Sequence, residues 1–347
     1  MVGCEAKSLS REEQWIIQQC GFGGFILFSH NCGDPAQIVS LCRSLWATGT
    51  EEPPFIAIDQ EGGRVHRLPF PFTHFPAAAV FGRRADPDVA SKAARATAVE
   101  LALVGINLDF APVLDVNSNP KNPVIGDRSF AADPEHVIKL TEGWIQGLRD
   151  GGIIPCGKHF PGHGDTDKDS HLNLPVVDKA LEDLRNVEFP PFNHACQNRI
   201  ESLMTAHVLY PALDSKFPAT LSHSIVTGLL RQQWGYEGVV FSDDMEMKAI
   251  TDNYGEEEAV ALCVRAGSDV LLYGHELPRA VRAFEFLCSE AERDPAVRAR
   301  VEHSHRRIVQ VKELFLRHFS GLPATKVVGE LARLHHQRIV DEIQGNL

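Results

Sequence analysis

The stretch KHFPGHGDTDKDSH, residues 158–171, concentrates side chains that can transfer protons or bind metals. Its fourteen positions hold three histidines, three aspartates and two lysines, interrupted by Pro161, Gly162 and Gly164. Histidine titrates near neutral pH and is also a common metal ligand, and aspartate can serve as a base or a ligand. The stretch therefore suits acid–base chemistry, a metal site, or a polar loop without chemistry.

Asp169 and His171 stand two residues apart in this stretch. On a loop, this interval allows the carboxylate to accept a hydrogen bond from the imidazole and to stabilise its protonated form. The pair therefore predicts an acid–base group.

A metal site is the alternative, because His159, His163, Asp169 and His171 are all possible zinc ligands. His159 and His163 have the HxxxH interval, which clamps a metal well on a helix. The intervening proline and glycines disfavour a helix, so this hypothesis is weaker. A third interpretation is a simple loop, since glycine and aspartate are common in loops that carry no catalysis.

Seven short apolar runs indicate the strands that would position these residues. Continuous rather than alternating hydrophobicity is typical of parallel strands covered on both faces. The runs occupy residues 24–28, 55–59, 106–116, 153–160, 202–208, 238–244 and 268–274.

Asp-Pro pairs indicate where several of the intervening helices begin. The aspartate can cap a helix whose first turn accepts the proline. Such pairs stand at 34–35, 86–87, 133–134 and 294–295, and helically spaced apolar residues follow the last two.

Strands that alternate with helices predict one continuous α/β architecture, a single (β/α)₈ TIM-type barrel. The eighth strand is then MVGC at the start of the chain, which is short and suggests a truncated first strand. The prediction is one catalytic barrel over residues 1–347, with C-terminal helices from about residue 294. The runner-up, an open doubly wound sheet, predicts a GxGxxG turn, and the sequence contains none.

Polar residues close most of the apolar runs. In a barrel the active site lies at the carboxyl ends of the strands, so these residues are candidates for it. Singly, each is explained as a helix cap or loop hydrogen bond, but together they suit a sugar or acid substrate. Asp243 and Asp244 are consecutive on one strand, so only one of them can face the barrel mouth. The run ends are Asp59–Arg64, Asp115–Asn117, Lys158–His159, His207 and Ser242–Asp244.

Composition limits the function classes. The net charge of −12 disfavours binding to nucleic acid or anionic membranes. No apolar run approaches the roughly 20 residues that cross a bilayer, and MVGCEAKSLSREEQ lacks the pattern of a secretory signal. Eight scattered cysteines without a CxxC pair are expected to be reduced and mostly buried. We therefore expect a cytoplasmic protein that acts on a small molecule.

Four segments in this order resemble the β-N-acetylglucosaminidases of glycoside hydrolase family 3. KHFPGHGDTDKDSHLNLP (158–175) is similar to the signature loop of that family, which runs Lys-His-Phe-Pro-Gly-His-Gly, a spacer, Asp-Ser-His and a later proline. IDQEGGRVHRL (58–68), IGDRSF (125–130) and GVVFSDDMEM (238–247) are similar to its other segments. The resemblance covers nearly the whole chain.

The resemblance implies a (β/α)₈ barrel that removes non-reducing terminal N-acetyl-β-glucosamine with retention of configuration. It implies Asp243 as nucleophile, His171 as general acid/base and Asp169 as the group that orients His171. No metal or other cofactor is implied. The positions similar to those that hold the sugar hydroxyls are Asp59, Arg67, Arg128, Lys158 and His159.

The implied role is cytoplasmic recycling of peptidoglycan, with 1,6-anhydro-N-acetylmuramoyl peptides as substrates. A β-glucosidase, a β-xylosidase or a glycoside phosphorylase on the same barrel is the alternative. From other classes, a metallohydrolase using His159, His163 and His171, or a barrel that binds sugar without turnover, also fits the residues. Glu246 adds a negative charge beside Asp243 and is expected to raise the pKa of the nucleophile.

Overall fold

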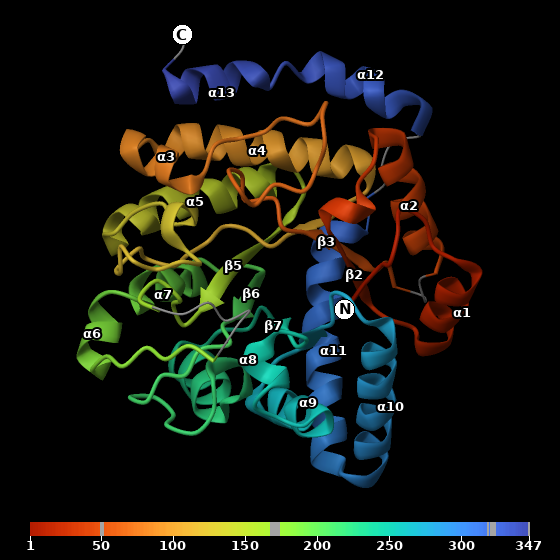
Figure 1. Ribbon diagram of the computed structural model, residues 1–347, viewed down its shortest axis with the longest axis vertical. Coiled ribbons are helices and arrows are strands. Elements are labelled where there is room, and N and C mark those ends of the chain that lie inside the picture. Colours follow the sequence, from red (N-terminus) through yellow and green to blue (C-terminus); the bar gives the residue numbers. More distant parts are fainter. Residues whose placement is uncertain (49–51, 167–173, 318, 320–323, 346–347) are drawn as a thin grey trace. The chain divides into compact units, whose positions relative to one another are not determined.

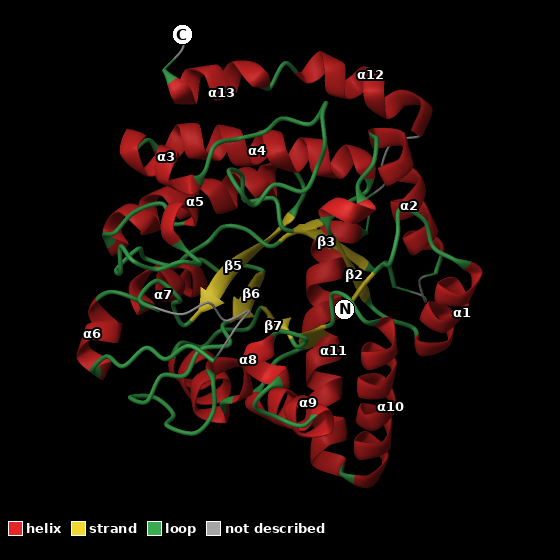
Figure 2. Ribbon diagram, viewed as in Figure 1, coloured by secondary structure: helices red, strands yellow, loops and turns green. Residues whose placement is uncertain are grey.

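The computed structural model describes residues 1–48, 52–166, 174–317, 319 and 324–345. In these residues, helices alternate with strands along the chain, and the strands form one parallel sheet in the order β1-β2-β3-β4-β5-β6-β7-β8 (Figures 1 and 2). The predicted α/β fold of the (β/α)₈ barrel class is confirmed. Asp169 and His171 lie outside the described residues.

The chain divides into two compact units. Unit 1 consists of residues 1–112, 139–156 and 312–347, and unit 2 of residues 113–138 and 157–311. β5 (Ile154–Phe160) and α11 (Pro295–Leu316) each contribute residues to both units, as does α5 (Pro134–Asp150).

Unit 1 contains the first four strands and the start of β5. The predicted first strand is confirmed as a two-residue β1, in which Val2 and Gly3 pair with Phe25 and Ile26. β4 is much shorter than predicted from 106–116, because Pro112 has no N–H to donate to a ladder. The strands are β1 (Val2–Gly3), β2 (Gly24–Leu27), β3 (Phe55–Ile58) and β4 (Leu108–Asp109).

Helices cover the strands of unit 1. α12 packs on α2 and α4, and α13 packs on α3 and α4 (Figure 1). The helical elements are α1 (Arg11–Cys20), η1 (Ser29–Asn31), α2 (Pro35–Ala47), α3 (Ala78–Arg84), α4 (Pro87–Val104), α12 (Ala324–Leu334) and α13 (Gln337–Gln344).

Unit 2 contains the end of β5 and the last three strands, all parallel and lined by buried residues such as Phe160, Leu203 and Phe241. The strands are β6 (Ser202–Thr205), β7 (Val239–Asp244) and β8 (Val270–Leu272). The helical elements are η2 (Gly126–Arg128), α6 (Leu181–Asn186), α7 (Phe189–Gln197), η3 (Ala219–Leu221), the π-helix η4 (Ser224–Gln233), α8 (Lys248–Thr251), α9 (Glu256–Ala266) and α10 (Leu277–Arg293).

The predicted Asp-Pro helix starts are confirmed. Asp34 and Asp86 accept backbone N–H groups of α2 and α4, and Asp133 and Asp294 do the same for α5 and α11. Each cap satisfies donors that the first helical turn leaves unpaired.

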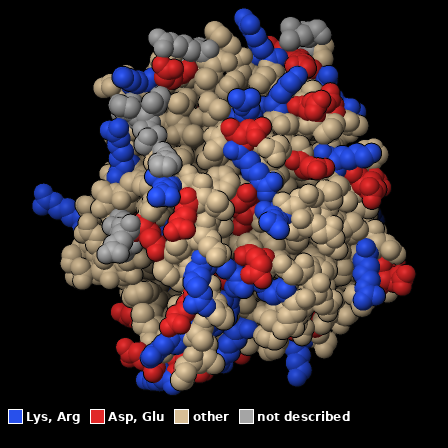
Figure 3. All heavy atoms as spheres, turned by 180° about the vertical axis from the view of Figure 1, so that it is seen from behind, with Lys and Arg blue, Asp and Glu red and all other residues tan. Residues whose placement is uncertain are grey.

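Acidic and basic side chains are interspersed over the face seen in Figure 3. The described residues of that face therefore form no broad area of one sign. No helix in the described part of the chain has the length and apolar character needed to cross a membrane.

Candidate active site

Asp115 accepts hydrogen bonds from the residues at the end of β5 and just after it. Its side chain is fully buried, and its Oδ2 lies 2.7 Å from Nδ1 of His159. Its Oδ1 accepts the backbone N–H of His163 at 2.7 Å, and the N–H of His159 lies 3.2 Å from both oxygens. One carboxylate thus fixes the His159 ring and the turn that follows β5.

Arg128 approaches the other side of the His159 ring. Its Nη2 lies 3.4 Å from Nε2 of His159, and its Nη1 donates to the carbonyl of Val124 at 3.2 Å. Nδ1 of His159 faces Asp115, so Nε2 is the ring nitrogen that faces Arg128. The predicted sugar-binding residues Arg128 and His159 are therefore in contact.

The protonation states around Asp115 follow from burial and pairing. Burial alone would raise the pKa of the Asp115 carboxyl, but the charge and hydrogen bonds of His159 and His163 outweigh it and hold that pKa below its ordinary value. Burial, together with the His159 charge, lowers the pKa of His163 to about 4. At neutral pH the site therefore contains an ionised Asp115 and a neutral His163.

Asn122 forms hydrogen bonds to the first half of the 158–171 stretch. Its Nδ2 donates to the carbonyls of His163 (2.8 Å) and Gly164 (3.0 Å), and its Oδ1 accepts the N–H groups of Val124 and Ile125. A Cβ at Gly164 would collide with the carbonyl oxygen of Val116, so only glycine permits this approach. These contacts define the path of the chain up to Thr166.

Asp243 and Asp244 close β7 in different environments. Asp243 is half-buried, and its Oδ1 accepts the N–H of Asp244 at 2.8 Å. Asp244 accepts the N–H groups of Glu246 at 3.0 Å and Gly274 at 3.3 Å, and burial raises its pKa to about 7. Asp244 thus accepts two backbone hydrogen bonds, and which of the two carboxylates faces the barrel mouth stays a prediction.

Glu246 stabilises the loop after β8. Its carboxylate accepts the backbone N–H groups of His275 at 2.6 Å and Glu276 at 2.8 Å, just before α10. Its negative charge contributes to the raised pKa of Asp244, after the larger effect of burial. The expected effect on Asp243 stays a prediction.

Asp59 and Arg67 form a second pair of predicted residues, in unit 1. Nη2 of Arg67 lies 3.5 Å from Oδ2 of Asp59. Gln60 stabilises the segment between them, because its Oε1 accepts the Arg67 N–H at 2.9 Å and its own N–H donates to Asp109. The contact holds the Arg67 guanidinium beside the Asp59 carboxylate.

The structure thus brings together two of the predicted sets, Asp59 with Arg67 and Arg128 with His159. Lys158 precedes His159 on β5 and is buried, and Asp243 ends β7 in the same unit. Asp115 is the residue whose role the sequence did not predict, although its place at the end of an apolar run was a signal.

The metal hypothesis stays a hypothesis, because Asp169 and His171, two of its candidate ligands, lie outside the described residues. In that part of the chain, no three His, Cys, Asp or Glu side chains gather in a way that could hold a metal ion. The nitrogens of His159 face Asp115 and Arg128, and Nδ1 of His163 lies 2.9 Å from the Thr166 hydroxyl.

A barrel of this class with polar residues at its strand ends is an enzyme scaffold. Residues 1–311 match the glycosyl hydrolase family 3 N terminal domain. The chain therefore belongs to glycoside hydrolase family 3, and it is a glycoside hydrolase.

Relatives support this membership. A β-hexosaminidase from Alkalilimnicola ehrlichii is 41% identical over 290 residues, which cover 82% of each chain. A β-N-acetylglucosaminidase structure from Paenibacillus sp. has a TM-score of 0.87 at 37% identity, covering 96% of this chain and 66% of that chain. The Neisseria gonorrhoeae NagZ structure in complex with N-trifluoroacetyl-D-glucosamine has a TM-score of 0.81 at 31% identity, covering 99% and 96%.

Proposed function

We propose that the protein is a retaining exo-β-N-acetylglucosaminidase that uses Asp243 as its nucleophile. The observation that carries the proposal is the position of Asp243 at the carboxyl end of β7, in the unit that also carries Lys158 and the Arg128–His159 contact. The names of the relatives, hexosaminidase and N-acetylglucosaminidase, support the substrate class.

In the proposed mechanism, the Asp243 carboxylate attacks the anomeric carbon and forms a covalent glycosyl ester. His171 donates a proton to the leaving oxygen, and then takes a proton from the water that hydrolyses the ester. Asp169 stabilises the imidazolium in the first step and orients the ring in the second. The roles of His171 and Asp169 rest on the family resemblance.

The described residues would hold the sugar in a fixed orientation. A charged arginine gives stronger hydrogen bonds to hydroxyls than a neutral donor does. Arg128, held by the Val124 carbonyl, and Arg67, held beside Asp59, are suited to this task together with Lys158 and His159. Asp115, whose side chain is fully buried, positions His159.

We further propose that the substrates are 1,6-anhydro-N-acetylmuramoyl peptides in the cytoplasm, within peptidoglycan recycling. All eight cysteines are free in the structure, and seven of them are buried or partly buried. Free thiols suit a reducing compartment.

The test is hydrolysis of 4-nitrophenyl N-acetyl-β-glucosaminide beside the glucoside and the xyloside. We expect turnover of the N-acetyl sugar alone, and loss of at least about 10³-fold in kcat for Asp243→Asn. Asp244→Asn is the matched control, because its carboxylate accepts structural hydrogen bonds, and it should retain most activity. Full steady-state activity of Asp243→Asn would disprove the proposal.

Three further readouts separate the alternatives. His171→Ala should slow turnover least for substrates with a good leaving group, because they need little protonation. Loss of activity with EDTA would favour the metallohydrolase. Formation of a sugar 1-phosphate in phosphate buffer would favour a phosphorylase.

A further inference from the structure

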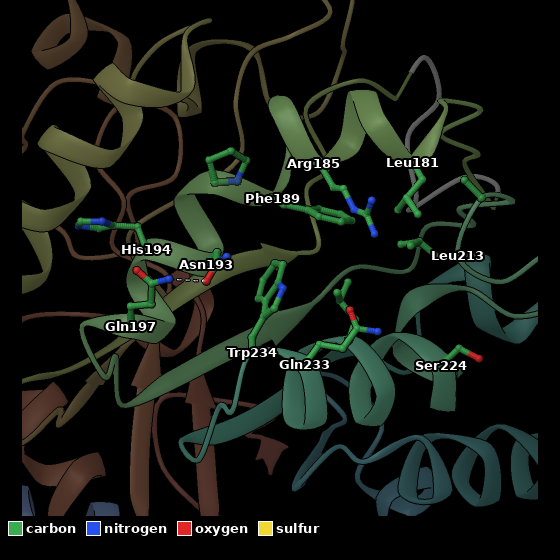
Figure 4. A pocket seen from close by; sticks show the side chains of 13 residues that line it. Leu181, Arg185, Phe189, Asn193, His194, Gln197, Leu213, Ser224, Gln233 and Trp234 are labelled. Atoms are coloured by element: carbon green, nitrogen blue, oxygen red, sulfur yellow. Dashed lines mark hydrogen bonds between the residues drawn. The ribbon is translucent and has the colours of Figure 1, made fainter.

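Unit 2 contains a pocket of about 640 Å³ that is lined by none of the predicted site residues that the structure describes (Figure 4). Its walls come from α6, α7, the turn at Ala212 and Leu213, and η4 with the Trp234 that follows it. The volume lies within the roughly 300–1,000 Å³ range of small-molecule sites.

The apolar wall of the pocket is held in place by aromatic packing. Trp234 is half-buried, and its ring meets Phe189 edge-on at 5.5 Å and Phe160 edge-on at 5.6 Å between centroids. Figure 4 shows Phe189 and Trp234 side by side in the pocket, with Leu181 and Leu213 nearby. A wall fixed in this way loses little conformational entropy when a ligand binds.

The polar wall is positive. Arg185 is exposed on α6, and Figure 4 shows its guanidinium beside Leu213. Among the described residues that line the pocket there is no aspartate or glutamate, although the chain carries a net charge of −12. This local charge favours an anionic group, and a guanidinium binds a carboxylate in a bidentate manner.

Side-chain amides complete the lining. Asn193 uses its Oδ1 to accept a hydrogen bond from Gln197 at 3.2 Å, which directs its own N–H groups elsewhere. Gln233 adds a second amide at the end of η4. Amides beside aromatic rings suit a saccharide, whose hydroxyls bond to the amides while its C–H face covers a ring.

The helix that forms one wall is unusual. η4 is a π-helix of ten residues, Ser224–Gln233, and π-helical segments are rare and frequent at functional sites. Its last turn, in which the N–H of Trp234 donates to the carbonyl of Leu229 at 3.1 Å, places the indole in the pocket. This backbone feature is independent of the side chains that line the pocket.

We propose that this pocket is a second saccharide-binding site, specific for a sugar that carries a carboxylate. Arg185 binds the carboxylate, Trp234 and Phe189 cover the apolar part of the sugar, and Asn193 and Gln233 bond to its polar groups. None of the described residues assigned to hydrolysis lines the pocket, so the proposal does not depend on the substrate proposed above.

The test follows the indole N–H resonances of the four tryptophans in ¹⁵N-labelled protein, with N-acetylmuramic acid as the probe. N-acetylglucosamine is the matched ligand, because it has the same ring without the lactyl carboxylate. We expect the Trp234 resonance to shift saturably with N-acetylmuramic acid, and at least about tenfold more weakly with N-acetylglucosamine.

Arg185→Gln should weaken the effect of N-acetylmuramic acid by about tenfold and leave hydrolysis unchanged. The control is Arg265→Gln, which removes an exposed arginine of α9 outside the pocket and should change neither result. The proposal would be overturned if the Trp234 resonance did not shift with N-acetylmuramic acid, or if it shifted equally in wild type and Arg185→Gln. A response to lactate at equal concentration would show an anion site without saccharide specificity and would overturn it as well.

Discussion

At the residue scale, two Asp–His pairs of equal length show how burial decides the importance of a contact. The pairs Asp115–His159 and Asp133–His136 both join Oδ2 to Nδ1 at 2.7 Å. The first has 0% and 8% of its side-chain surfaces exposed, and the second 55% and 54%. Screening by water weakens the exposed pair, whereas the buried carboxylate also supports two backbone N–H groups.

We therefore predict that Asp115→Asn destabilises the protein by about 3 kcal/mol and lowers kcat/KM. An amide cannot accept all the hydrogen bonds of the carboxylate, and the His159 ring loses its partner. Urea unfolding measures the change. Asp133→Asn is the control and should cost less than about 1 kcal/mol, because asparagine still caps α5. Equal losses in the two variants would contradict the role assigned to Asp115.

The sequence predicted Asp115 as a polar strand end but not its partner. His159 lies 44 residues later, and the contact depends on how the 113–116 segment meets β5, where the N–H of Leu114 donates to the carbonyl of Lys158. Such pairing depends on register, which a local pattern does not contain. That only one of Asp243 and Asp244 can face the barrel mouth is predictable, because alternation along a strand is a local property.

At the element scale, three glycines of the α5 region allow close packing on α4. Gly143, Gly147 and Gly151 are four residues apart, so they lie along one face. A Cβ at Gly143 would stand 2.5 Å from the carbonyl oxygen of Pro87, and a Cβ at Gly147 would collide with that of Ser91. The packing therefore requires the absence of side chains on this face.

We predict that Gly147→Ala destabilises the protein by about 2 kcal/mol, because the added methyl group overpacks the contact with α4. Gly329→Ala is the matched control. It also lies on a helix, but its Cβ would meet nothing within 4 Å, so the better helix propensity of alanine should stabilise by up to about 1 kcal/mol. The unfolding temperatures of both variants measure these changes. Stabilisation by Gly147→Ala would disprove the packing argument.

The elements were predictable to different degrees for physical reasons. Asp-Pro starts are determined by capping within a few residues, and all four were found from the sequence. The apolar run at 106–116 predicts a longer strand than β4, because hydrophobicity does not reflect the N–H donor that Pro112 lacks. The π-helix η4 was not predicted, since its apolar residues also fit an ordinary helix.

At the scale of the whole molecule, buried titratable groups set the pH dependence of stability. Burial lowers the pKa of His163 to about 4 and raises the pKa of Asp244 to about 7. Between pH 4 and 6.5 the unfolded chain protonates His163 and the folded chain does not, so this group favours folding as pH rises. Asp244 acts in the opposite direction, because the folded state keeps its proton up to about pH 7.

We predict that His163→Gln and Asp244→Asn change the pH profile in opposite ways. His163 costs up to about 3 kcal/mol of stability as pH falls from 6.5 to 4, so His163→Gln should reduce the loss in acid. Asp244→Asn should remove a loss that develops as pH rises from about 4 to 7, and so should gain most relative to wild type above pH 7. Urea unfolding at pH 4.5, 5.5, 7 and 8 measures both slopes, and each variant serves as the control for the other. Slopes that change in the same direction would contradict the assigned protonation states, since His163 destabilises the folded state at the acid end of the range and Asp244 at the alkaline end.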